Sequence, residues 1–378
     1  MNQSIKRGAV RLAMAALVLV SFAMGTARAA EPGLDTMIGQ MLMIGFRGTD
    51  ASAPGVQSML EDIEAGRVGG VALFDYDVIL KERGRNITSP EQLKRLVALL
   101  QSRAKVPLLV AVDQEGGKVR RLKPRDGFPE ALSAQELGSR NDPAFTEAAG
   151  ETTGRMLAEA GINLNCAPVV DVNVNPDNPV IGKLERSFSA SPQTVADMAR
   201  AFIRGQSRCG VLSCIKHFPG HGSAWNDSHS GMADVTATWT PLELIPYETL
   251  FAEKAPVLVM TAHVFNANLD PDYPATLSKK IITGMLRGDL GFQGVVISDD
   301  MQMKAVTQYF GLEESIQLAV NAGVDILLFP NNLEYDPAVA STATALIKRM
   351  VAEGRIPGER IQESYARIMA IKQSLSMQ

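Results

Sequence analysis

Residues 215–229 of this 378-residue chain read Ile-Lys-His-Phe-Pro-Gly-His-Gly-Ser-Ala-Trp-Asn-Asp-Ser-His. The stretch holds three of the chain's four histidines and ends an apolar run that begins at Val211. An imidazole titrates near neutral pH, and a carboxylate two residues before a histidine can fix its tautomer and raise its basicity. A single histidine is more often a capping or solvated residue. Three histidines clustered among glycines instead indicate a functional loop at the end of a strand.

The apolar run before this loop is one of eight runs of strand length. They cover residues 41–46, 68–74, 107–113, 163–171, 211–218, 257–264, 294–300 and 324–329. Nearly continuous Val, Ile and Leu are typical of parallel strands that are covered on both faces. Eight strand–helix units predict an α/β protein with a (β/α)₈ TIM-type barrel, formed as a single domain by residues 31–378. A doubly wound open sheet is the competing topology.

Amphipathic segments of helical length lie between these runs. They cover residues 90–104, 144–161, 192–210, 246–254, 278–290 and 313–323. Several begin after a serine or aspartate and end in a glycine, as helices commonly do. Two C-terminal helices, predicted at residues 337–353 and 358–374, complete the outer layer of the barrel.

The first thirty residues have the pattern of a secretory signal peptide. Lys6, Arg7 and Arg11 precede an apolar run over residues 12–24, and Ala27-Arg28-Ala29 forms a small-x-small cleavage site. The run is short for a bilayer span. We therefore expect residues 1–30 to be removed from an exported, periplasmic or secreted protein that keeps no stable membrane span.

Composition narrows the choice of partners. Residues 1–30 carry four basic side chains and no acid, so the remaining chain has 33 basic and 41 acidic residues, a balance of −8. This acidic surface argues against a nucleic-acid partner. The odd set of Cys166, Cys209 and Cys214 allows at most one disulfide, and we expect Cys166 and Cys214 to be buried free thiols. We expect a monomer.

Polar side chains cluster at one end of the predicted strands. They close five of the eight runs: Asp113, Asp171, Lys216-His217, His263 and Asp299-Asp300. The active sites of (β/α)₈ barrels lie at the carboxyl ends of the strands. The polarity of this pattern therefore predicts a site on one face of the barrel.

The third and fourth runs are followed by two motifs that suit a polyol ligand. Asp113-Gln114-Glu115-Gly116-Gly117 combines a carboxylate with glycines that let the backbone approach a ligand, and Arg121 follows. A plain βα turn with an aspartate cap explains this motif equally well. After the fourth run, a long loop rich in Pro and Asn leads to Arg186, which could reach a substrate. Asp171 and the asparagines are expected to hold that loop together.

Two adjacent carboxylates, Asp299 and Asp300, end the seventh run. Successive side chains of a strand point to opposite faces, so only one of them is expected to face the site while the other caps the following helix. We favour Asp299 for the site, although the residues alone give it little advantage over Asp300.

Four ordered motifs together closely resemble glycoside hydrolase family 3 β-N-acetylglucosaminidases over residues 35–330. They are residues 113–117, residues 175–179 with 186–188, residues 216–222 with 227–229, and residues 298–300. The resemblance implies a (β/α)₈ barrel that needs no cofactor or metal. It also implies a retaining β-N-acetylhexosaminidase that removes terminal N-acetylglucosamine from a small carbohydrate substrate.

Residue roles carried over from the family follow from matching positions. Asp299 matches the nucleophile, His229 the acid/base, and Asp227 its dyad partner. The positions that hold the sugar match Asp113, Arg121, Arg186, Lys216 and His217. His221 is expected to support the loop. The substrate would be a peptidoglycan fragment or a chitin-type oligosaccharide.

Other functions stay open. A neutral histidine repels phosphate less than a carboxylate does, so a glycoside phosphorylase of the same family is one alternative, and a family 3 β-glycosidase for another sugar is a second. The histidines with Asp227 and Asp299 could also belong to a metal-dependent hydrolase, although their spacing matches no usual ligand motif and Lys216 opposes a cation. An exported sugar-binding protein is the non-enzymatic alternative.

Overall fold

Eight parallel strands form the central sheet of the computed structural model, which describes residues 32–228 and 231–376. They are β1 (Leu42–Gly45), β2 (Gly70–Ala72), β5 (Leu109–Val112), β6 (Leu164–Asn165), β7 (Leu212–Phe218), β9 (Val257–Thr261), β11 (Val296–Ile297) and β12 (Leu327–Phe329). Their order is β11-β9-β7-β6-β5-β2-β1-β12. A parallel bridge joins Ile297 of β11 to Ile326 beside β12, so the two edges meet and the sheet curls into a nearly closed barrel.

The barrel confirms the predicted (β/α)₈ architecture and excludes the open doubly wound sheet. Each of the eight predicted runs contains one strand of the barrel. Every residue of β1, β5 and β9 is buried, because one face of each strand meets the barrel interior and the other meets the helices. The signal peptide predicted for residues 1–30 lies outside the described residues.

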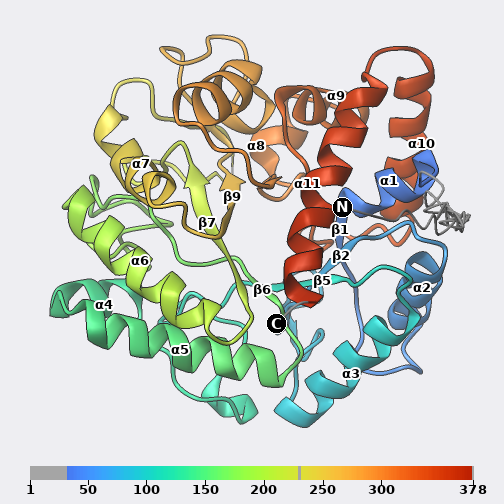
Figure 1. Cartoon of the computed structure of the whole chain (residues 1–378), viewed down its shortest axis with the longest axis horizontal. Coiled ribbons are helices and arrows are strands. Elements are labelled where there is room, and N and C mark those ends of the chain that lie inside the picture. The colour runs from blue at the N-terminus through green and yellow to red at the C-terminus, as the bar shows by residue number, and fades with distance from the viewer. Residues whose placement is uncertain (1–31, 229–230, 377–378) are drawn as a thin grey trace, which may run out of the picture. The chain divides into compact units, whose positions relative to one another are not determined.

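Helices surround this ring of strands (Figure 1). They are α1 (Leu34–Gln40), α2 (Pro54–Glu64), α3 (Pro90–Arg103), α4 (Ala134–Arg140), α5 (Pro143–Glu159), α6 (Pro192–Ser207), α7 (Ile245–Ala252), the π-helix η4 (Lys280–Asp289), α8 (Lys304–Thr307), α9 (Leu312–Ala322), α10 (Val339–Ala352) and α11 (Gly358–Ser376). Short 3₁₀ helices cover Pro124–Asp126, Pro241–Leu244 and Ala275–Leu277. The eight predicted helices are all present, and the sequence analysis missed α1, α2, α4 and α8.

Side-chain caps explain where several helices begin. Ser89 and Ser191 accept hydrogen bonds from the first turns of α3 and α6, and Asp142 does the same for α5. Ser133 and Glu136 form a reciprocal capping box at the start of the short helix α4. This capping box was a readable signal for α4 that the hydrophobic pattern alone did not reveal.

Two small two-stranded sheets lie outside the barrel. The hairpin β3 (Tyr76–Asp77) and β4 (Glu82–Arg83) is antiparallel, whereas β8 (Ala233–Asp234) pairs with β10 (Val264–Phe265) in parallel. All three cysteines are free thiols, and Cys166 and Cys214 are buried as expected. Within the described parts of the chain, no helix combines the length and apolar character needed to cross a membrane.

Candidate active site

One cavity of about 310 Å³ collects most of the predicted site residues at the carboxyl ends of the strands. Its border includes Asp113, Arg121, Arg186, Lys216, His217 and Asp299. Asp227 is half-buried, and its neighbour Ser228 borders the cavity. His229, the predicted acid/base, lies outside the described residues.

The end of β7 presents two successive side chains to this cavity. Lys216 and His217 both border it, although neighbours on a regular strand point to opposite faces. The pairing of β7 with β9 shifts register between Ile215 and Phe218, and the Lys216–His217 peptide bond is cis. An irregularity of this kind re-aims side chains and is common beside active sites.

A buried ammonium group joins two carboxylates at the cavity floor. The Nζ of Lys216 lies 2.7 Å from Asp113 Oδ1 and 2.7 Å from Glu115 Oε1. Burial opposes the charged form of Lys216, but the two carboxylates outweigh it and raise the pKa of Lys216 above its ordinary value. The lysine therefore stays charged at any physiological pH.

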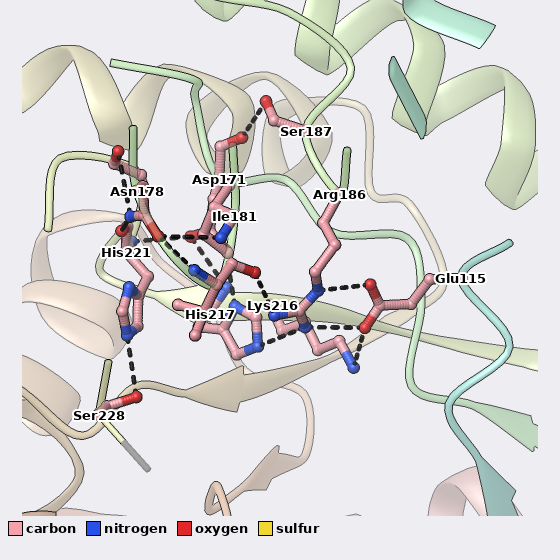
Figure 2. Close-up of polar contacts among 12 residues, drawn as sticks. Glu115, Asp171, Asn178, Ile181, Arg186, Ser187, Lys216, His217, His221 and Ser228 are labelled. Carbon is pink, nitrogen blue, oxygen red and sulfur yellow. Dashed lines mark hydrogen bonds and ion pairs between the residues drawn. The ribbon is translucent and has the colours of Figure 1, made fainter. Parts of the chain in front are cut away.

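Two guanidinium groups complete this network, and Figure 2 shows the one that belongs to Arg186. Arg186 binds Glu115 in bidentate fashion, with Nε–Oε2 and Nη2–Oε1 distances of 2.7 and 2.8 Å. Arg121 Nη2 donates to Asp113 Oδ2 at 2.8 Å. Burial alone would raise the pKa values of Asp113 and Glu115. The positive charges of Lys216 and these arginines outweigh this effect and hold both pKa values below their ordinary values. The result is a fixed array of donors and acceptors that suits the hydroxyl groups of a sugar.

Asp171 fixes His217 from below the cavity. Its carboxylate contacts His217 Nδ1 at 2.6 Å and accepts hydrogen bonds from the backbone N–H groups of His217 and His221, at 3.2 and 2.8 Å. His217 Nε2 lies 3.3 Å from Arg186 Nη2. Asp171 is fully buried, and its carboxylate holds the histidine-rich turn, whereas the sequence predicted that it would hold its own Pro- and Asn-rich loop.

The asparagine-rich loop is tied to the histidine-rich turn. Asn178 Nδ2 donates to the carbonyl of His221 at 2.7 Å, and Asn175 Nδ2 donates to the carbonyl of Ala224 at 2.9 Å. Asn178 Oδ1 also accepts the N–H groups of Val180 and Ile181. These bonds explain why the two motifs occur together: each shapes the other's backbone.

His221 lies on this turn and contacts Ser228, the residue after Asp227. Its Nε2 is 3.0 Å from Ser228 Oγ, and both side chains are almost fully buried (Figure 2). Burial, and then the neighbouring His217, lower the pKa of His221 to about 4. The ring is therefore neutral at pH 7 and supports the segment beside Asp227, in the role predicted for it.

Glu243 supports the same turn from behind. Its Oε2 accepts the N–H of Gly222 at 3.0 Å, and the side chain is fully buried. Gly220 has a φ of +128°, and a Cβ atom there would lie 2.7 Å from the Glu243 side chain. Only glycine fits this approach. Burial raises the pKa of Glu243 to about 8.

The two carboxylates after β11 have different surroundings. Asp299 is half-buried on the cavity border, and its Oδ1 accepts the N–H of Asp300 at 2.8 Å. Asp300 Oδ1 accepts the N–H of Gln302 at 2.7 Å, and its carbonyl accepts a hydrogen bond from His263 Nε2 at 2.9 Å. Asp300 also borders the cavity, but it is buried and shapes the backbone that leads into α8, whereas Asp299 is the more exposed of the two carboxylates.

Two residues of this site were not predicted from the sequence. Glu115 belongs to the motif at residues 113–117, and a second carboxylate so close to Asp113 was the feature that could have identified it. Glu243 gave no signal, because it stands between two leucines without a motif. Among the described residues, no group of three or more His, Cys, Asp and Glu side chains is placed to hold a metal ion.

Comparison with known proteins gives one consistent family. The model described as "Glycosyl hydrolase family 3 N terminal domain" matches residues 33–371. Beta-hexosaminidase A of Pseudoalteromonas piscicida is 32% identical over 386 residues, which cover 92% of this chain and 63% of that protein.

Solved structures agree with this result. A glycoside hydrolase family 3 beta-N-acetylglucosaminidase from Paenibacillus sp. str. FPU-7 is 36% identical with a TM-score of 0.82, over 91% of this chain and 63% of that one. A beta-N-acetylhexosaminidase from Beutenbergia cavernae is 32% identical with a TM-score of 0.80, over 91% of this chain and 99% of that one. The chain therefore spans less than two thirds of some relatives and nearly the whole of another.

Replacing Glu115 with glutamine should destabilise the protein at pH 7 by about 3 kcal/mol, because Lys216 and Arg186 lose a buried counter-charge. The pKa of Glu115 is lowered in the folded state, so this stabilisation is present above its ordinary value of 4.5 and is lost as the pH falls through the folded value. Urea unfolding at pH 7 and pH 4 measures both effects. The exposed Glu130→Gln is the matched control, and equal stabilities of the two variants at pH 7 would contradict the assignment.

Replacing Glu243 with glutamine keeps an oxygen that accepts the Gly222 N–H but removes the titratable carboxyl group. Because the folded pKa of about 8 exceeds the ordinary 4.5, wild-type stability should fall as the pH rises between these values. As the pH is raised from 5 to 8, the Tm of the variant should fall by a few degrees less than the Tm of the wild type. Glu248→Gln, exposed on α7, should follow the wild type. The same pH dependence in all three proteins would show that Glu243 does not titrate in this range.

Proposed function

Because this chain belongs to glycosyl hydrolase family 3, we propose that it is a retaining β-N-acetylhexosaminidase that releases terminal N-acetylglucosamine. The observation that carries this proposal is the meeting, in one cavity, of Asp299 with the charged network of Asp113, Glu115, Arg121, Arg186 and Lys216. Asp299 borders the same cavity as this array of fixed donors and acceptors, an arrangement that fits attack on a bound sugar. The names of the relatives, a beta-hexosaminidase and two enzymes that act on N-acetylated sugars, support N-acetylglucosamine as the sugar.

In the first chemical step, Asp299 attacks the anomeric carbon. The bond between that carbon and the glycosidic oxygen breaks, and His229 gives its proton to the departing oxygen. A covalent glycosyl–Asp299 ester remains. Asp227 stabilises the charged imidazole before this transfer, as a carboxylate partner does for a catalytic histidine.

In the second step, His229 takes a proton from water, and the water oxygen attacks the anomeric carbon from the face that the leaving group vacated. The ester bond to Asp299 breaks, and the sugar leaves with its original anomeric configuration. Lys216, Arg186 and Arg121 hold the hydroxyl groups through both steps, which keeps the anomeric carbon in line with the attacking oxygen.

We propose peptidoglycan fragments or chitin-type oligosaccharides as the natural substrates. The predicted signal peptide supports this choice, because it would place the enzyme in the periplasm or outside the cell, where such polymers occur. A cavity of about 310 Å³ has room for one sugar ring, which fits removal of a single terminal residue.

Replacing Asp299 with asparagine should lower kcat by on the order of a thousand-fold or more, because the nucleophile is lost. Asp227→Ala should lower it by on the order of a hundred-fold, because the acid/base histidine loses its partner. Steady-state assays on an aryl N-acetyl-β-glucosaminide measure both changes. Asp289→Asn, at an exposed position of η4, is the matched control. Wild-type activity in Asp227→Ala or His229→Ala would refute the proposed acid/base role of the Asp227–His229 dyad.

A comparison of two aryl glycosides should define the activity itself. The wild type should cleave the N-acetyl-β-glucosaminide far faster than the β-glucoside, and added phosphate should leave the rate and the product unchanged. Release of a sugar 1-phosphate would instead identify a phosphorylase. Preference for the glucoside would assign a different sugar specificity, and binding without turnover of either compound would favour a sugar-binding protein.

A further inference from the structure

The lining of the cavity divides by the strands that supply it. The loops after β5, β6 and β7 supply the charged side chains around Lys216, together with Val119, Val180 and Leu184, and we call this the charged half. Strand β12 and the segments after β2 and β12 supply mostly apolar side chains, and we call this the apolar half: Phe74, Val78, Leu328, Pro330 and Leu333. A sugar's hydroxyl groups are satisfied by the first half, so the second half is free to contact apolar surface.

The β3–β4 hairpin reaches the apolar half through Val78, which lines the cavity. Its tip carries three consecutive apolar residues that are well exposed: Val78 at 46%, Ile79 at 43% and Leu80 at 51%. Tight turns normally carry polar residues, glycine or proline. An exposed apolar cluster on a folded protein commonly marks a contact site.

A buried ion pair holds the base of the hairpin. Asp77 is only 2% exposed; its Oδ2 accepts from Arg47 Nε at 2.7 Å and pairs with the buried Arg85. Asp77 Oδ1 accepts the N–H of Leu80 at 2.9 Å. Burial opposes ionisation, but the hydrogen bond from Arg47 and the nearby guanidinium charges hold the pKa of Asp77 at about 2. The hairpin turn is thus fixed from inside.

A second anchor connects the hairpin to the loop after β12. Asn332 Oδ1 accepts the N–H of Val78 at 3.0 Å, and Asn332 Nδ2 donates to the carbonyl of Tyr76 at 3.2 Å. Arg85 Nη2 donates to the carbonyl of Asn331 at 2.7 Å. These bonds fix the hairpin where Val78 borders the cavity, with Ile79 and Leu80 exposed beside it.

We propose that the tip residues Val78 and Leu80 form a binding surface for the leaving group of the substrate, and that they favour leaving groups with an apolar face. This inference rests on the proposed function. If the enzyme removes a terminal sugar, that sugar occupies the cavity, and the leaving group is the part of the substrate that extends out of it toward the rim. The hairpin then sets specificity without touching the reacting atoms.

The test compares two substrates that share the N-acetylglucosaminyl group. One is 4-methylumbelliferyl N-acetyl-β-glucosaminide, with a flat apolar leaving group, and the other is N,N′-diacetylchitobiose, with a polar one. The double variant V78S/L80S should raise KM for the aryl substrate by about five- to ten-fold, the loss expected when two aliphatic side chains no longer cover an apolar surface. KM for the disaccharide should stay within about two-fold of the wild-type value.

The control is Leu242→Ser, at a side chain that is 56% exposed in the 3₁₀ helix Pro241–Leu244, outside this cavity. It should change neither KM. Unchanged KM values in V78S/L80S would overturn the proposal, and so would an equal rise for both substrates, because the hairpin would then act on the sugar itself.

Binding measurements separate this inference from the proposed function. In an Asp299→Asn background, fluorescence titration with the aryl glycoside needs no turnover, and V78S/L80S should weaken its binding while the methyl glycoside, as competitor, binds unchanged. A wild type that cleaves neither substrate would refute the proposed function, and the titration would then decide the role of the hairpin. Equal affinities for the aryl glycoside with and without the hairpin substitutions would overturn the proposed role of the hairpin.

Discussion

The site depends on the burial of one ammonium group. Lys216 is 3% exposed at the end of β7, and an isolated lysine there would lose its charge or disrupt the fold. Asp113 from the end of β5 and Glu115 two residues later prevent this, each at 2.7 Å from its Nζ. Since Glu115 also binds Arg186, and Asp113 also binds Arg121, this one requirement brings together three loops that are distant in the sequence.

Barrel closure makes this network possible. The charged residues that meet at the cavity lie at the end of β7 or follow β5, β6 and β11, and the bridge between Ile297 and Ile326 completes the ring that brings the carboxyl ends of these strands to one face. A second set of buried residues holds the residues that border the cavity in place. Asp171, Asn178 and Glu243 are buried and hold the backbone of the histidine-rich turn. The reacting groups can therefore be few, because the surrounding residues are positioned before substrate arrives.

The sequence predicted the barrel because its strands are buried on both faces and leave continuous apolar runs. It also predicted the charged side chains at the cavity, since polar residues interrupted those runs only at one end. Glu243 escaped prediction because a buried carboxyl group leaves no periodic signal, and its partner is a backbone N–H. The β3–β4 hairpin escaped because its apolar tip resembles part of a core strand, and only the anchors at Asp77 and Asn332 show that it faces outward.

The central claim is that Asp299 forms a covalent bond to the sugar. The direct measurement is mass spectrometry of the protein after incubation with a fluorinated N-acetylglucosaminyl fluoride, a compound designed to slow breakdown of the glycosyl–enzyme ester. This account predicts one added glycosyl group per chain, located by peptide mapping on Asp299 and absent in Asp299→Asn. An adduct on Asp300, or turnover of a natural substrate with inversion at the anomeric carbon and no adduct, would contradict it.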